Sequence, residues 1–141
     1  MVRSLAAVVA GLFVLAVLTF AIEMATTPSL MRLFPEALPT REAMQGNVGV
    51  KLFILFYSSL AMVVAGYVTA RIAGRHELRH AIAMAVVQVA LTAWAMTAFY
   101  GHAPLWAWLA GMALMLPAAA LGARARGRAG VARGAAGQTG P

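Results

Sequence analysis

The sequence has no cysteine and few charged residues. The absence of cysteine excludes disulfides, thiolate metal sites and cysteine nucleophiles. Charged residues make up 11% of the 141 residues, whereas a soluble domain carries about 25%. Hydrophobic residues make up 62%, against roughly 45–50% in soluble proteins. A soluble domain of this length cannot hide so much apolar surface, so the composition predicts a membrane protein.

Acidic residues are scarce, with 4 acids against 11 Lys and Arg and a formal charge of +7. A basic balance is also typical of nucleic-acid-binding proteins. Here, however, the arginines lie beside long apolar runs, which favours anionic lipid headgroups as the partner and no nucleic acid. The arginines expected to contact headgroups are Arg71, Arg75, Arg79, Arg124, Arg126 and Arg128.

Long runs without Asp, Glu, Lys or Arg predict four membrane spans. Two of these runs are Ser4–Ile22 and Leu52–Ala70. The third, His80–Ala123, would make a helix of roughly 66 Å, about twice the hydrocarbon core, so it must fold back once. The strongest turn signal near its middle is 101–104, with Gly and Pro. The predicted fold is all-α and polytopic, a transmembrane domain over 1–123 built as two antiparallel hairpins with spans at about 4–25, 48–72, 81–100 and 104–123.

The positive charges divide unequally between the two sides of a four-span protein. Eight lie at the N-terminus, in the link between spans two and three, and after span four, while three lie on the other side. Positive residues in short loops favour the cytoplasm, so both termini are predicted to be cytoplasmic. The first span lacks a small-x-small cleavage site, so we expect it to stay uncleaved. The Ala, Gly, Arg and Val bias favours a bacterial source and the cytoplasmic (inner) membrane.

Two segments lie outside the predicted spans. The outer loop at 26–47 holds Thr26-Thr27-Pro28, which can start a short helix in the headgroup layer, and Pro39-Thr40-Arg41-Glu42, a turn or second helix start. The loop either covers an outer cavity or rests its apolar residues in lipid, and the second reading is simpler. The tail at 124–141 has almost no large side chains, so we expect a disordered basic cytoplasmic segment.

Glu23 is the only acid inside a predicted span. Intramembrane carboxylates often mark an ion or substrate path. Glu23 lies near the outer end, however, at a depth similar to that of Lys51 at the start of span two. We therefore expect an ion pair between them, with a transport site as the alternative, and His102 at the outer turn is a further candidate for this site.

Other polar and aromatic groups have simpler explanations. Gln88 and Thr92 are one turn apart and suit hydrogen bonds across helices. His76 and His80 are spaced like metal ligands but have no third ligand near them. The tryptophans near the outer ends of spans three and four are typical of an interfacial aromatic belt. No nucleophile–base pair or phosphate-cradling loop is present, so we expect no catalytic, metal or cofactor site.

Span two carries rows of small residues that favour close approach of another helix. The expected packing residues are Ala61, Ala65, Gly66, Ala70 and Gly74. The stretch 66–74 also resembles a segment of small, uncharacterised bacterial four-helix integral membrane proteins, in which a second helix ends in Gly-Tyr-x-x-Ala-x-x-Ala-Gly. That resemblance implies the four-helix layout of 1–123 and carries no activity with it.

Two functions fit these features. The first is a non-enzymatic membrane protein, an accessory subunit of a larger membrane complex or a small homo-oligomer that associates by helix packing. The alternative is a small oligomeric transporter or channel with Glu23 in the path. A cavity with Glu23 at its wall would favour the alternative.

Overall fold

The computed structural model describes residues 2–99 and 103–137, with side chains at 3–99 and 103–129, and this part of the chain is all-helical. Its helices are α1 (Val2–Leu33), α2 (Arg41–Gly46), α3 (Val48–Ala73), α4 (Glu77–Ala98) and α5 (Leu105–Gly137). Four of them, α1, α3, α4 and α5, are long and apolar enough to cross a membrane, as the sequence predicts.

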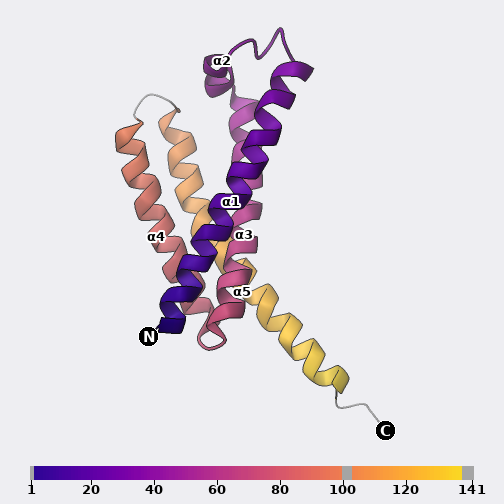
Figure 1. Cartoon of the computed structure of the whole chain (residues 1–141). Helices are drawn as coiled ribbons and strands as arrows, with labels where there is room; N and C mark the ends of the chain where they lie inside the picture. The colour runs from indigo at the N-terminus through magenta and orange to yellow at the C-terminus, as the bar shows by residue number, and fades with distance from the viewer. Residues whose placement is uncertain (1, 100–102, 138–141) are drawn as a thin grey trace.

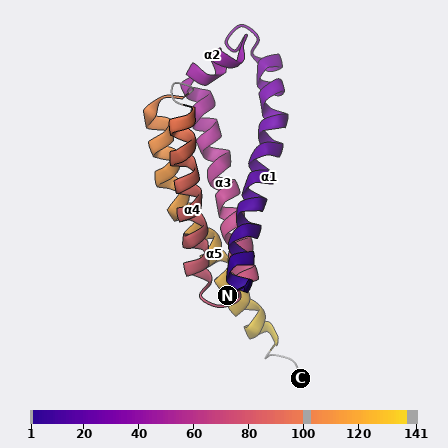
Figure 2. The ribbon, with the colours of Figure 1, turned by 60° about the vertical axis from the view of Figure 1, so that its left-hand side comes forward.

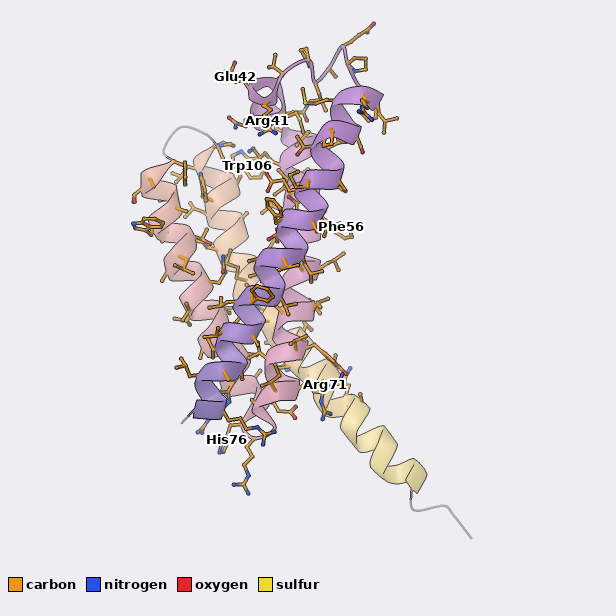
Figure 3. All side chains as sticks on the ribbon, in the orientation of Figure 1. Arg41, Glu42, Phe56, Arg71, His76 and Trp106 are labelled. Carbon is orange, nitrogen blue, oxygen red and sulfur yellow. The ribbon has the colours of Figure 1, made fainter. Side chains whose placement is uncertain are left out.

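The four long helices run between two ends of the molecule (Figure 1). We name one the α2 end, because it holds α2, the end of α1 and the start of α5. The other is the N-terminal end, where α1 begins, α3 turns into α4, and α5 leaves the bundle. In Figure 3, Arg41 and Trp106 lie toward the α2 end, and Arg71 and His76 lie at the N-terminal end.

α3 is the central helix of the bundle. Its backbone lies close to those of α1, α2, α4 and α5, whereas the backbone of α1 lies close to α3 and α4 and, among the described residues, not to α5. Figure 2 shows α1 leaning away from the other long helices toward the α2 end, where α2 and its loop bridge the separation. The bundle is therefore tightest toward its N-terminal end.

Small residues account for that tight packing. A Cβ built on Gly66 would lie 2.9 Å from the Cα of Ala119, and one on Gly122 would meet the backbone of Val63. α3 and α5 therefore touch backbone to backbone, which only glycine permits. The buried residues of this region are mostly alanines, with a few larger side chains: Ala61, Met62, Ala65, Ala70, Ala81, Met84, Ala85, Ala118, Ala119 and Ala123.

Local signals fix several helix ends. Thr40 caps α2, its hydroxyl accepting from the Ala43 N–H at 3.2 Å, so the predicted helix start in the outer loop is present. Asn47 caps α3 by accepting from the Val50 N–H at 3.1 Å. Gly74 ends α3 with a φ of 68°, a left-handed conformation that glycine adopts without steric cost.

α1 differs from the expected layout, because it continues through Pro28 to Leu33 instead of ending near residue 25. The predicted separate helix at Thr26–Pro28 is therefore the last part of α1. Pro28 removes one backbone hydrogen bond. Beside it, the hydroxyls of Thr26 and Ser29 donate to the carbonyls of Ile22 and Ala25, which makes them part of the helix instead of its cap.

The tail also differs from its expected form. Residues 124–137, predicted to be disordered, continue α5 as helix away from the bundle (Figure 1). Alanine and arginine have high helix propensity, and a helix that is already nucleated extends with little cost per residue. The small side chains of this segment cannot pack against other helices, but they keep the local preference of the backbone for helix. The last residues, 138–141, lie outside the described part.

Candidate functional site

Two adjoining, half-open cavities lie between the middle of the bundle and its α2 end. The larger, of about 640 Å³, lies among α1, α3, α4 and α5. The smaller, of about 380 Å³, lies between the bundle and α2. Glu23 lines both cavities. We call the two together the cleft, and Glu23 stands where its parts meet.

α1 contributes one helical face to the cleft. Ala16, Thr19 and Glu23 line the larger cavity at spacings of three and four residues, which places them one above the other. Phe20 stands beside them and supplies an apolar wall. The position of Glu23 on this face follows from the helix period, once one member of the face is known.

α3 contributes the opposite wall. Ser58, Ser59 and Met62 line the larger cavity, and Lys51 and Leu55 line the smaller one. Residues 51, 55, 58 and 62 repeat at helical spacing and so share a face. Each serine hydroxyl donates to a carbonyl one turn earlier, Ser58 at 2.7 Å and Ser59 at 2.6 Å. These hydroxyls therefore stay in the apolar span without needing a partner on another helix.

α4 and α5 close the cleft with fewer polar groups. Gln88 lines the larger cavity and donates to the Thr92 hydroxyl at the long distance of 3.5 Å. Thr92 in turn donates to the Met115 sulfur at 3.9 Å. The Gln88–Thr92 bond thus lies within α4, and the link across helices is a weak one to sulfur. Gly111 leaves room here, since a Cβ on it would meet only the Leu55 side chain, at 3.5 Å.

Glu23 and Lys51 both line the smaller cavity, on α1 and α3. The two charges interact electrostatically. No hydrogen bond or close ion pair between them is among the contacts of the described residues. Glu23 is exposed and Lys51 is partly buried. The structure therefore brings the predicted partners to one cavity and leaves the carboxylate accessible from it. His102, the third candidate, lies outside the described residues.

α2 covers the smaller cavity. Arg41, Met44 and Gln45 line it. Met44 also packs with Leu38 and Val50 in a small apolar cluster that fastens α2 to α3. The predicted loop therefore lies over a cavity, the arrangement that the lid interpretation of this segment requires.

The predicted packing residues divide into two groups. Ala61, Ala65, Gly66 and Ala70 are buried inside the chain, against α1, α4 and α5. Gly74 lies past the end of α3, where its left-handed backbone conformation is used and a Cβ would lie 3.0 Å from the Arg3 guanidinium. The small-residue rows are thus occupied by helices of the same chain.

The six arginines expected to contact headgroups lie at the N-terminal end, as their positions in the sequence require. Arg71, Arg75 and Arg79 are exposed around the α3–α4 turn, and Arg124, Arg126 and Arg128 follow along α5. One further arginine makes a specific contact: the Arg3 Nε donates to the Ile72 carbonyl at 2.9 Å. Sequence reasoning counted Arg3 only as a charge, and its contact with the end of α3 depends on the tertiary fold.

The described residues contain no group of three or more His, Asp or Glu side chains placed to hold a metal. At the pair His76 and His80, the His80 Nδ1 lies 3.1 Å from the His76 carbonyl. The cleft residues that sequence reasoning missed are Thr19, Ser58 and Ser59. Hydroxyls do recur at helical spacing from Glu23 and Lys51, but the sequence does not fix the helix rotation that turns them toward a cavity.

The site is therefore an apolar cleft with one carboxylate at its centre, hydroxyls along its walls and a short helix across one side. Its shape and lining suit the binding of a small molecule. Comparison with known proteins adds no assignment to this geometry. No protein-family model, curated protein sequence or solved structure matches the chain.

Proposed function

We propose that the protein is a small, non-enzymatic transporter or channel of the bacterial inner membrane, in which the cleft receives a solute and Glu23 lies in its path. The cavity of about 640 Å³ with Glu23 at its wall carries this proposal. Sites for small molecules measure about 300–1,000 Å³ and combine an apolar lining with a few polar groups. The cleft has both properties.

The proposed orientation places the α2 end outside and both termini in the cytoplasm. The eight-to-three division of positive residues supports this orientation. The cleft then lies in the outer part of the bundle, and the packed N-terminal half lies toward the cytoplasm. The exposed arginines of that half would contact anionic headgroups of the inner leaflet. Reporter fusions at residue 78 and at the C-terminus should read cytoplasmic, and one at residue 38 external. A C-terminus on the outside would overturn the orientation.

Four helices enclose little space, so the complete path is expected to need an oligomer or a movement of α1. Among the described residues, α1 has no close backbone approach to α5 and leans away from the other long helices toward the α2 end, which leaves room for such a movement (Figure 2). The other prediction, an accessory subunit or homo-oligomer joined by helix packing, rested on the small rows of α3. Because α1, α4 and α5 of the same chain occupy these rows, that prediction has lost its main support, and we rank it second.

Solute currents across reconstituted membranes test the proposal. Proteoliposomes on a solid-supported membrane would receive concentration jumps of small amines, inorganic cations, carboxylates and neutral sugars. We expect at least one solute to give a current or uptake that Glu23→Gln removes and Glu36→Gln keeps. Glu36 is a suitable control because it is an exposed carboxylate that does not line the cleft. Equal currents in empty liposomes, or equal currents in both variants, would refute the proposal.

A further inference from the structure

The hydroxyl groups of the cleft point to the chemistry of its ligand. The Thr19 hydroxyl donates to the Leu15 carbonyl at 2.8 Å, and Ser58 and Ser59 donate within α3. A hydroxyl has one hydrogen and two lone pairs. Once the hydrogen is used within the helix, the oxygen can offer only lone pairs to the cavity. The hydroxyls of the larger cavity are therefore acceptors.

Glu23 adds a negative charge to these acceptors. An ionised carboxylate accepts hydrogen bonds and donates none. Among the described residues, it is the one charged side chain that lines the larger cavity, whereas Arg41 and Lys51 line only the smaller one. Gln88 contributes one amide, which has an acceptor oxygen as well as N–H donors, and the rest of the wall is mainly apolar, with Phe13, Phe20, Met62 and Met115 among its members. A complementary ligand carries a positive charge with N–H donors on an apolar body.

Lys51 is an ammonium group of the chain itself that lines the smaller cavity together with Glu23. Its charge interacts with that of Glu23 from the smaller cavity, without a close ion pair among the contacts of the described residues. The Lys51 side chain has a long, flexible stem. The chain's own primary amine thus competes for Glu23 with any cation that enters the cleft.

We infer that the cleft binds a primary or secondary ammonium group on an apolar body, with the nitrogen at Glu23 in place of Lys51. This inference deepens the proposed function and rests on the cleft being its solute site. Two sources supply this chemistry: a free amine from outside, or the ethanolamine headgroup of a lipid whose chains enter the larger cavity.

A matched series of probes tests the inference on the full chain in phosphatidylcholine nanodiscs. The probes are 2-phenylethylammonium, its quaternary trimethyl analogue, neutral 2-phenylethanol and anionic 3-phenylpropionate, titrated calorimetrically against empty nanodiscs. We expect saturable binding of the primary ammonium and at least about tenfold weaker binding of the other three, because they lack charge, N–H donors or both. Equal binding of the quaternary cation, or preference for the anion, would overturn the inference.

Variants of the cleft residues test where the ammonium nitrogen of the ligand binds. Glu23→Gln should weaken binding of 2-phenylethylammonium at least about tenfold, and Glu36→Gln should leave it unchanged. Lys51→Met should strengthen it by up to about fivefold, since it removes the competing amine. The double variant Ser58→Ala, Ser59→Ala should weaken it while keeping Glu23, which maintains the test if Glu23→Gln fails to fold. Unchanged affinity in a folded Glu23→Gln protein would contradict the assignment.

Adding phosphatidylethanolamine to the nanodiscs distinguishes a free amine from a lipid headgroup as the ligand. If phosphatidylethanolamine in the nanodiscs lowers the apparent affinity for the free amine, the headgroup occupies the site. If it has no effect, the ligand is a free amine. Absence of saturable amine binding in phosphatidylcholine overturns the inference. Amine binding without any current would refute transport alone, and currents of other solutes without amine binding would refute the ligand class alone.

Discussion

The two halves of the bundle are built from the same four helices but pack in opposite ways. In the N-terminal half, Gly66 and Gly122 bring α3 and α5 into backbone contact, and Gly11 lies against Thr69 of α3. In the α2-end half, the facing positions hold larger or polar side chains, such as Phe20 and Leu55, and a cleft remains. Side-chain volume at the facing positions thus sets the helix separation, because lipid gives apolar helices little hydrophobic reason to associate.

Substitution of a glycine in each half tests this comparison with the largest effect. Gly66→Leu should cost more than about 3 kcal/mol, because its Cβ alone meets the backbone of Ala119, which cannot move aside cheaply. Gly111→Leu should be tolerated, since its Cβ meets only the Leu55 side chain. Thermal unfolding in detergent measures both.

The contrast between these variants matters more than either value. Gly111→Leu should fill part of the cleft and reduce any ligand binding while the protein stays folded. If Gly66→Leu unfolds at the same temperature as the unmodified protein, the close approach of α3 and α5 is absent. If Gly111→Leu destabilises as much as Gly66→Leu, the α2-end half is packed and not open.

Much of the closed half was predictable from the sequence, and little of the open half was. Uncharged runs predict four spans because length and polarity fix them. The costs of a glycine in mid-helix predict that Gly66 packs against another helix. The rotation of each helix was not predictable, because lipid and protein interior are both apolar and leave no amphipathic pattern. Ser58 and Ser59 therefore could not be assigned to a cavity.

The helix boundaries at Pro28 and Arg124 show a second limit. Both sites carry signals for an end, a proline in one case and the loss of large side chains in the other. Local hydrogen bonds and helix propensity outweigh these signals, because extending a helix that is already nucleated costs little per residue. Sequence signals for a helix end are weakest where a long helix leaves its packed region.

A charge exchange tests how far the open half depends on Glu23 and Lys51. Either Glu23→Lys or Lys51→Glu should cost about 1 kcal/mol, the upper size for accessible pairs. The double variant should recover most of that loss, since the attraction returns with reversed sign. Unfolding of all four proteins in detergent gives the coupling energy. Losses that simply add would mean that the residues act independently, and Glu23 would then be held for a ligand alone.

Arg3→Gln probes the opposite end with a smaller effect. The Arg3 Nε donates to the Ile72 carbonyl in the last turn of α3. A cation there interacts with the helix dipole by about 0.3–1 kcal/mol. Glutamine lacks the positive charge, so the free energy of unfolding should fall by that amount at low salt. The loss should be smaller at high salt. Arg75→Gln, an exposed arginine just beyond α3, is the control and should have no effect. Equal losses from both would indicate a general effect of charge.

The smallest expected effect on stability comes from Gln88→Leu. This variant tests whether the polar residues of the otherwise apolar cleft serve helix packing or ligand binding. If Gln88 served to hold helices together, its loss would cost about 0.6 kcal/mol or more, as for interhelical hydrogen bonds in membranes. Its one described hydrogen bond is long and stays within α4, so we expect a change below about 0.5 kcal/mol. Binding of 2-phenylethylammonium should weaken at the same time, because a polar group of the cavity wall is removed. Stability that holds while binding falls would assign the polar residues of the open half to the ligand. Lost stability with unchanged binding would mean that these polar residues serve helix packing. The two halves would then differ only in packing density.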